Sequence, residues 1–201
     1  MGNIYMVRHG ETLWNNTMRF QGASDIALSD TGIAQAEKLA ESFTNKNFIA
    51  IYSSDLQRAF KTADIVAKRK GLEVIKEPLI KEMSFGEWEG LNGKQINEKW
   101  PGSLDVFFED PKNFDPPGGE SFFQMQKRVC GAFYNICARH IENDILIVSH
   151  GGTIRAILAD ILKMDLTGIW KMRQSNTGVN IIARHGEDFV VNLVNSTIHL
   201  Q

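Results

Sequence analysis

Two short, almost unbroken apolar runs constrain the fold more than any other feature of the sequence. They are "IYMV" at 4–7 and "ILIVS" at 145–149. A strand with one face in water alternates apolar and polar residues, whereas a strand covered on both faces does not. Both runs therefore predict central strands of a parallel sheet. Each leads directly into a charged or polar stretch, Arg8-His9 after the first and His150 after the second. These residues are expected at the carboxyl ends of the strands, where such sheets bind ligands.

The rest of the chain alternates between strand-like and helix-like patterns. Further strands are predicted at 48–54 and 72–75, and a hairpin at 179–184 and 188–194. Helices are predicted at 30–45, 55–70, 93–100, 120–140 and 153–162, with 83–119 otherwise a loop. This order predicts an α/β fold, a three-layer αβα sandwich with a mostly parallel central sheet. We expect one domain over residues 1–201.

Composition narrows the classes of partner. The net charge is −2, which gives no sign of a nucleic-acid partner. No apolar run approaches the ~20 residues of a membrane span. Cys130 and Cys137 lie seven apart in a predicted helix, an axial rise of about 10 Å that is too long for a disulfide. Reduced thiols are typical of the cytoplasm, which is the predicted location.

The tetrapeptide Arg-His-Gly-Glu occurs twice, at 8–11 and at 184–187. The first copy follows a buried strand and leaves the sheet, as residues at a ligand site do. The second lies between two predicted strands, where Gly186 can supply the positive φ of a hairpin turn. We expect only the first copy to be functional.

Three predicted strand ends together contribute two arginines and two histidines. Arg58 follows the run "IYSSD", in which Asp55 is expected to cap the next helix. It joins Arg8, His9 and His150. Two guanidinium groups can hold the oxygens of a phosphate, and they oppose a metal cation. The cluster therefore predicts a phosphate site.

Each residue of this cluster also has a purely structural explanation. Arg58 could pair with Glu82 or Asp55, and His150 could be a hydrogen-bonded histidine of the core. A single residue of this kind is weak evidence for a site. Four of them at three strand ends favour one.

Five blocks of the chain, in order, resemble the histidine phosphatase superfamily, in its phosphoglycerate-mutase-like branch. They are "RHGET" (8–12) with Asn15, "RFQGASDIALSDTGIAQA" (19–36), "IYSSDLQRAFKTA" (51–63), "KEMSFGEWEG" (81–90) and "IVSHGGTIRA" (147–156). The resemblance covers nearly the whole chain and implies a phosphoglycerate-mutase-like fold. It implies phosphoester chemistry without a metal or other cofactor.

The resemblance also implies a role for each matching residue. His9 would be the nucleophile that becomes phosphohistidine, and Glu82 the general acid and base. Arg8, Arg58 and His150 would hold the transferring phosphoryl group. The remaining pocket residues would be Asn15, Gln21 and the backbone at Gly22 and Gly151.

Three other glutamates compete with Glu82 for the role of acid, namely Glu87, Glu89 and Glu11. The family pattern places an aromatic residue and a glycine three residues after the acid. Phe85-Gly86 meets that pattern and selects Glu82. Glu11 would instead shape the loop after His9.

The stretches "DPPGGESF" (115–122) and "EMSFGEWEG" (82–90) most resemble small bacterial phosphatases of the α-ribazole-5′-phosphate type. Mutases of the family have a longer insertion here, so a phosphatase is favoured over a cofactor-dependent phosphoglycerate mutase. Broad-specificity and phosphoserine phosphatases are alternatives. A non-catalytic phosphate-binding module is disfavoured because His9 and Glu82 are both present. A dinucleotide-binding protein is disfavoured because no G-x-G-x-x-G follows the first strand. The expected partner is a small phosphorylated metabolite, and homodimerisation is left open.

Aromatic residues are concentrated in the irregular region 83–119. Most are expected in the core, and one or two are expected to line the leaving-group pocket, where apolar surface is usual. That arrangement would suit a substrate whose alcohol half has a ring or an apolar face. Whether the region acts as a lid is left open. The residues are Trp88, Trp100, Phe107, Phe108 and Phe114.

Overall fold

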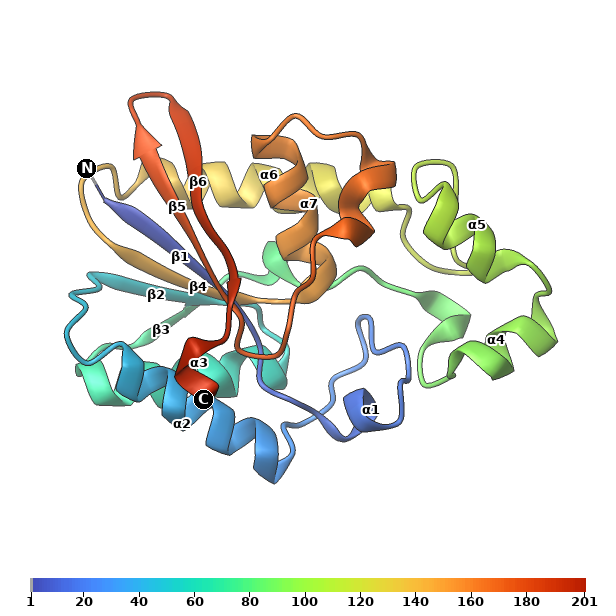
Figure 1. The fold of residues 1–201 in the computed structure, drawn as a ribbon, viewed down its shortest axis with the longest axis horizontal. Coiled ribbons are helices and arrows are strands. Elements are labelled where there is room, and N and C mark those ends of the chain that lie inside the picture. The colour runs from blue at the N-terminus through green and yellow to red at the C-terminus, as the bar shows by residue number, and fades with distance from the viewer. Residues whose placement is uncertain (1) are drawn as a thin grey trace.

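A computed structural model describes residues 2–201, in which six strands form one mixed sheet (Figure 1). The strand order is β3-β2-β4-β1-β5-β6. Strands β1 to β4 run parallel to one another, β5 pairs antiparallel with β1, and β6 pairs antiparallel with β5. The predicted mostly parallel sheet is confirmed. The strands are β1 (Asn3–Arg8), β2 (Ala50–Ser53), β3 (Val74–Lys76), β4 (Ile145–Ser149), β5 (Val179–His185) and β6 (Asp188–Ser196).

Helices cover both faces of the sheet (Figure 1). Helices α2 (Asp30–Ser42) and α3 (Gln57–Lys70) pack on one face, and α6 (Phe122–Ala138) and α7 (Gly151–Ile161) on the other. Short helices α1 (Leu13–Asn16), α4 (Gly93–Lys99) and α5 (Ser103–Glu109) lie outside these layers. Short 3₁₀ helices occupy Pro78–Ile80, Gly86–Trp88, Leu166–Lys171 and Ile198–Leu200.

The first strand shows why its sequence is apolar throughout. Ile4 and Met6 belong to the apolar cluster beneath α6 and α7, whereas Tyr5 and Val7 belong to the cluster beneath α2 and α3. Alternate side chains of a strand point to opposite faces, so a strand between two helical layers needs apolar residues at every position. The same holds for β4, whose five residues are all buried.

The prediction that 83–119 lacks further helices is wrong, because residues 103–109 form α5. Leu104 and Phe107 lie one turn apart and pack in an aromatic cluster with Trp88. The expectation was wrong because this helix is held by tertiary contacts rather than by a long amphipathic pattern.

Asp55 does not cap α3 as expected. The N-cap position is Leu56, and the Gln57 N–H instead donates to Asp25 Oδ1 at 2.7 Å. Asp55 lies one residue too early and faces Lys81, with 3.7 Å between Oδ2 and Nζ. A carboxylate from another loop therefore replaces the local cap.

The second Arg-His-Gly-Glu copy forms the predicted hairpin turn. His185 pairs with Asp188, and Gly186 has φ +65°. His185 is exposed. Elsewhere, Cys130 and Cys137 are buried and unbridged, as expected. No helix within residues 2–201 is both long and apolar enough to span a membrane.

Candidate active site

The register of the two central strands brings His9 and His150 together. Arg8 at the end of β1 pairs with Ser149 at the end of β4, so the next residue of each chain segment is a histidine. The ring centroids are 5.2 Å apart, and both side chains are buried. Strand β2 lies on the other side of β4 and leads into α3, whose first turn contains Arg58.

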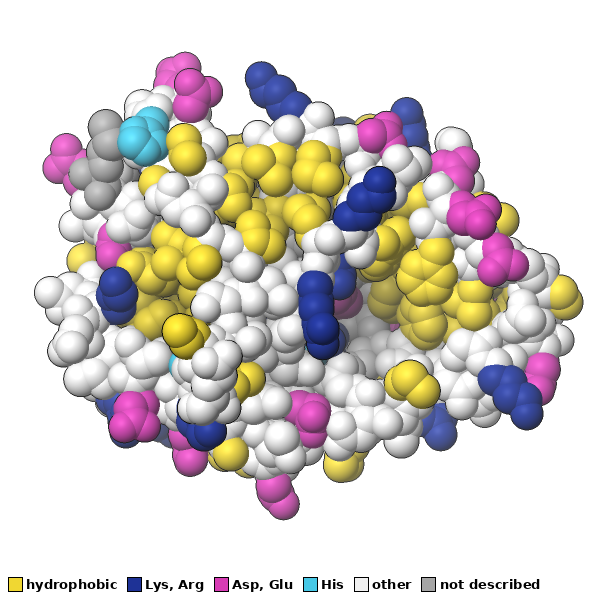
Figure 2. All heavy atoms as spheres, in the orientation of Figure 1, with side chains coloured by type: hydrophobic (Ala, Val, Ile, Leu, Met, Phe, Trp, Pro, Cys, Tyr) yellow, Lys and Arg dark blue, Asp and Glu magenta, His cyan; other side chains and the backbone are white. Residues whose placement is uncertain are grey.

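A cavity of about 210 Å³ opens at this edge of the sheet. Figure 2 shows the surface hollowed between the main body and the α4–α5 region, with hydrophobic side chains along the α4–α5 wall. Of the predicted residues, His150 and Gly151 do not line the cavity, since His150 packs against the His9 ring and Gly151 lies beside Arg8. Those that do line it are Arg8, His9, Asn15, Gln21, Gly22, Arg58 and Glu82.

The two arginines are held by backbone carbonyls rather than by carboxylates. Arg58 is fully buried and donates to Gly22 O and Ser24 O, each at 2.7 Å, and not to Asp55 or Glu82. Arg8 Nη1 donates to Gln174 O at 2.7 Å. Burial lowers the pKa of each guanidinium to about 10, so both are cationic at neutral pH. Their charge is thus not neutralised by direct ion pairs and is available to an anion.

The His9 ring has a fixed orientation. Its Nδ1 lies 2.7 Å from Gly10 O. A carbonyl only accepts hydrogen bonds, so Nδ1 carries the proton and Nε2 has the free lone pair. Burial, followed by the charges of Arg58 and Arg8, holds the His9 pKa well below its ordinary value. The imidazole is therefore neutral at physiological pH.

His150 is not a hydrogen-bonded core histidine. It is fully buried, and neither ring nitrogen has a hydrogen-bond partner among residues 2–201. Burial lowers its pKa well below the ordinary value, with further contributions from Arg58, His9 and Arg8. A buried polar group without a partner costs roughly 1–3 kcal/mol, so the site carries unused hydrogen-bonding capacity.

Glu82 reaches the cavity from the segment between two 3₁₀ turns. Its carboxylate accepts the N–H of Gly152 at 3.0 Å, of Thr153 at 3.2 Å and of its neighbour Met83 at 3.1 Å. Two of these donors belong to the first turn of α7, where a carboxylate is favoured. A Cβ at position 152 would collide with Glu82 Oε1, so the close contact between this carboxylate and α7 requires glycine there.

The three competing glutamates do not line the cavity. Glu87 is exposed. Glu11 Oε1 accepts from Ser29 Oγ at 3.0 Å, which is the loop-shaping contact expected for it. Glu89 instead accepts three backbone N–H groups, from Ala23 at 2.9 Å, Ser24 at 2.8 Å and Phe85 at 3.0 Å.

Polar groups from α1 and from the loop after it complete the wall. Asn15 Oδ1 accepts the Thr12 N–H at 2.9 Å in a capping box, which leaves the Nδ2 donor for a ligand. Gln21 is buried, and its Oε1 has no partner within residues 2–201. Gly22 has φ +55°, a conformation that favours glycine.

Sequence reasoning missed the hydrogen bonds that hold the backbone of Arg8 and His9 in place. Asn176 Nδ2 donates to His9 O at 3.0 Å, and the Thr177 N–H donates to Arg8 O at 3.0 Å. The polar run "QSNTG" (174–178) before β5 was the available signal. Arg19 was also missed. It lines the cavity while donating to the carbonyl of Gly90.

A second, more apolar cavity of about 450 Å³ adjoins the first and shares Met18 and Phe20 with it. Phe108, one of the aromatic residues noted in the sequence, lines this cavity and is 49% exposed. Trp88 and Phe107 are buried in the aromatic cluster, as expected for most of the group.

Across residues 2–201, no three His, Cys, Asp or Glu side chains lie close enough to hold a metal ion. The charged groups nearest the His9 ring are arginines, which attract an anion. The arrangement suits a phosphate ester, with a neutral imidazole at its centre and a carboxylate at its edge.

Comparison with known proteins gives a consistent result. The sequence model of the histidine phosphatase superfamily (branch 1) matches residues 4–197. Phosphoserine phosphatase 1 of Hydrogenobacter thermophilus is 34% identical over 100% of this chain and 95% of its own length. The metal-independent phosphoserine phosphatase of Arabidopsis thaliana is 35% identical over 98% of this chain and 82% of its own. The structure of Bacillus stearothermophilus YhfR superposes with a TM-score of 0.95 at 31% identity, covering 100% of both chains.

Proposed function

Since the chain belongs to the histidine phosphatase superfamily, we propose that it hydrolyses phosphomonoesters in two steps through a phosphohistidine at His9. One observation carries the mechanism. The Gly10 carbonyl fixes the proton of His9 on Nδ1, so Nε2 is free beside two cationic arginines. The resemblance noted in the sequence thus agrees with the chemistry of the site.

In the first step His9 Nε2 attacks phosphorus and the bond from phosphorus to the ester oxygen breaks. Charge on the three equatorial oxygens is stabilised by Arg8, Arg58 and His150. The leaving oxygen takes a proton from Glu82, which lines the cavity beside His9. Asn15, Gln21 and the backbone at Gly22, which also line the cavity, add hydrogen bonds to the same three oxygens.

In the second step a water molecule attacks the phosphohistidine. Glu82 accepts a proton from this water, and the bond from phosphorus to nitrogen breaks. Phosphate leaves and His9 returns to its neutral form with Nδ1 still bonded to the Gly10 carbonyl. Covalent catalysis of this kind replaces one difficult displacement by two easier ones.

The substrate is a small phosphorylated metabolite, and phosphoserine is the first candidate because two of the relatives named above act as phosphoserine phosphatases. None of those named is an α-ribazole phosphatase, so α-ribazole 5′-phosphate stays a prediction from the sequence. The apolar cavity beside Met18 and Phe20 supports a ring or apolar face on the alcohol half. The whole of 1–201 would act as one domain, without a metal, in the cytoplasm.

The decisive experiment compares two histidines in identical tetrapeptides. His9→Ala should abolish hydrolysis of p-nitrophenyl phosphate, whereas His185→Ala, at the exposed hairpin turn, should leave it unchanged. Wild type, but not His9→Ala, should yield an acid-labile and alkali-stable phosphoryl label. Full activity of His9→Ala, or loss of activity in EDTA, would refute the proposal.

A substrate panel then identifies the alcohol. It contains phosphoserine, 3-phosphoglycerate, α-ribazole 5′-phosphate and p-nitrophenyl phosphate, with a phosphoglycerate acceptor in a second arm. Release of inorganic phosphate without transfer supports the phosphatase, and transfer to the acceptor supports the mutase. Equal kcat/KM for all esters would contradict the role given to the apolar cavity.

A further inference from the structure

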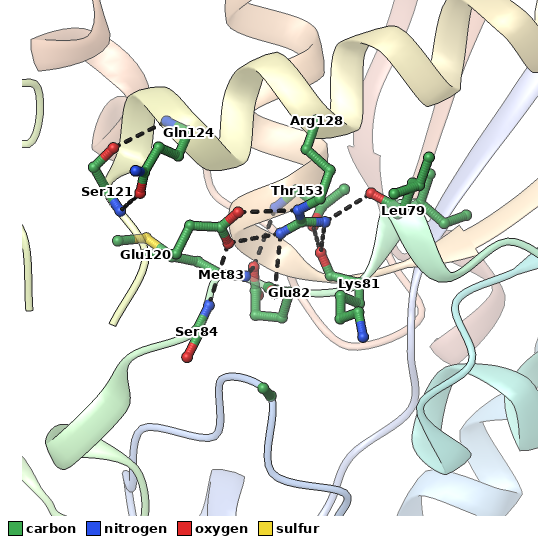
Figure 3. A network of polar contacts seen from close by, with 12 residues as sticks. Leu79, Lys81, Glu82, Met83, Ser84, Glu120, Ser121, Gln124, Arg128 and Thr153 are labelled. Atoms are coloured by element: carbon green, nitrogen blue, oxygen red, sulfur yellow. Dashed lines mark hydrogen bonds and ion pairs between the residues drawn. The ribbon is translucent and has the colours of Figure 1, made fainter. Parts of the chain in front are cut away.

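We propose that Arg128 and Glu120 are positioning residues for the acid Glu82, although neither lines the phosphate cavity. Figure 3 shows the pair beside the segment that carries Glu82. This inference rests on the proposed function, because it concerns a step in which Glu82 supplies a proton. It assigns a task to an ion pair that the mechanism above does not use.

The segment 79–84 needs such support because no regular element fixes it. It begins within the 3₁₀ turn Pro78–Ile80, ends before the turn Gly86–Trp88, and belongs to no strand of the sheet described. Arg128 Nη1, from α6, donates to Leu79 O at 2.7 Å and to Lys81 O at 3.1 Å. Its Nη2 lies 3.5 Å from Glu82 O. One guanidinium thus binds two backbone carbonyls that precede the acid and reaches the carbonyl of the acid itself.

Glu120 in turn fixes the guanidinium. Its two carboxylate oxygens accept from Arg128 Nε at 3.0 Å and Nη2 at 2.7 Å, a bidentate pair (Figure 3). The Glu120 N–H donates to Ser84 O at 2.9 Å. The side chains of Arg128 and Glu120 are only 19% and 20% exposed. Water therefore screens the attraction between their charges less than it does in a surface ion pair.

The opposite side of the segment is held by the sheet and α7. Ser149 Oγ donates to Ile80 O at 2.7 Å, and Thr153 Oγ1 donates to Lys81 O at 2.9 Å. The Glu82 carboxylate itself binds the first turn of α7. The acid is therefore clamped between α7 and α6, and Arg128 supplies the α6 side.

Arg128 acts at a distance from the reacting atoms. Together with Glu120 and Glu82 it lines a separate cavity of about 420 Å³, and Glu82 is the only one of the three that also lines the phosphate cavity. Lysine could not replace it, because a single ammonium lacks the planar fork that binds Glu120 and two carbonyls together.

The test uses the difference between leaving groups. An alkoxide needs a proton from the acid as it leaves, whereas p-nitrophenolate does not. In Arg128→Gln, kcat/KM for phosphoserine, or for the best alkyl ester of the panel, should fall by about 10-fold or more, since small misplacement of a catalytic group is costly. For p-nitrophenyl phosphate kcat/KM should change by less than about threefold.

Three further variants make this comparison specific. Arg139→Gln removes an exposed arginine at the C-terminal end of the same helix and should leave both esters unaffected. Arg128→Lys should resemble Arg128→Gln. Adding Arg128→Gln to Glu82→Gln should cause no further loss on the alkyl ester, because the two changes remove one function.

An equal fall for both esters in folded Arg128→Gln would overturn the inference and leave the proposed function intact. Absence of hydrolysis and of a phosphohistidine in wild type would instead refute the proposed function. Circular dichroism melting curves establish folding. Should Arg128→Gln not fold, the same ratio measured for Glu120→Gln decides, with a selective loss on the alkyl ester as the supporting result.

Discussion

The absence of a side chain at Gly152 allows the Glu82 carboxylate to bind the first turn of α7. Replacing a glycine by alanine inside a helix normally stabilises the helix by about 1 kcal/mol. In Gly152→Ala, however, the new Cβ would displace Glu82 from the first turn of α7. We expect kcat/KM for an alkyl ester to fall about 100-fold, in line with the loss of general acid catalysis.

Gly131→Ala provides the matched control. Gly131 lies inside α6, and a Cβ there meets nothing within 4 Å. This variant should be as active as wild type and about 0.5–1 kcal/mol more stable in urea unfolding. Wild-type kinetics in Gly152→Ala would show that the placement of Glu82 is not needed.

Individual side chains could be predicted from sequence where they follow a strand directly. Arg8 and His9 at the end of β1, and Arg58 in the first turn of the helix after β2, are of this kind. The other predicted residues that line the cavity were found through the family resemblance, namely Asn15, Gln21, Gly22 and Glu82. Arg128 and Glu120 could not be found, because they reach Glu82 only after α6 packs beside it. Asp55 was misassigned because a distant carboxylate, Asp25, takes the cap position.

Among the structural elements, the loop before α2 holds Arg58 and is itself held by Glu89. Its carbonyls at Gly22 and Ser24 accept from Arg58, and its N–H groups donate to Glu89. Glu89→Gln replaces one acceptor oxygen by a donor and leaves an N–H of this loop unpaired. We expect KM for p-nitrophenyl phosphate to rise about tenfold, since a hydrogen bond to a charged group contributes roughly 1.5–3 kcal/mol and this one holds the loop that binds Arg58.

Glu87→Gln is the matched control, because Glu87 is exposed two residues away. Its steady-state kinetics should equal those of wild type. Equal behaviour of the two variants would mean that Glu89 does not support the loop.

Elements with a strong local pattern were predictable, and elements that depend on distant contacts were not. The fully apolar strands β1 and β4 were identified as central, which is their place in the sheet order. Helix α5 was missed because it is stabilised by aromatic packing on Trp88. The run 174–178 was missed because its role is to bind the backbone of a strand far away in sequence.

For the whole molecule, stability should depend on pH through its histidines. Burial lowers the pKa of His9 and His150 well below the ordinary 6.5, and those of His140 and His199 are also lowered. Below pH 6.5 the unfolded chain therefore binds protons that the folded protein does not. This histidine contribution to the free energy of unfolding should be fully present above about pH 7.5 and should be lost progressively as the pH decreases through 6.5.

Urea unfolding at pH 7.5, 6.5 and 5.5 measures this dependence. The double variant His9→Gln, His150→Gln removes the two histidines whose pKa values are lowered most. Its free energy of unfolding should therefore fall less between pH 6.5 and 5.5 than that of wild type. A free energy of unfolding that rises toward pH 5.5 in wild type would contradict the burial of neutral imidazoles.

The pairing of β1 with β4 also sets when the protein can first act during its synthesis. His9 is translated well before β4 and His150, which complete its surroundings. In a nascent chain whose β4 has not yet emerged from the ribosome, the His9 imidazole is therefore expected to be exposed to water. The buried surroundings of His9 therefore form only after β4 has been translated and has paired with β1.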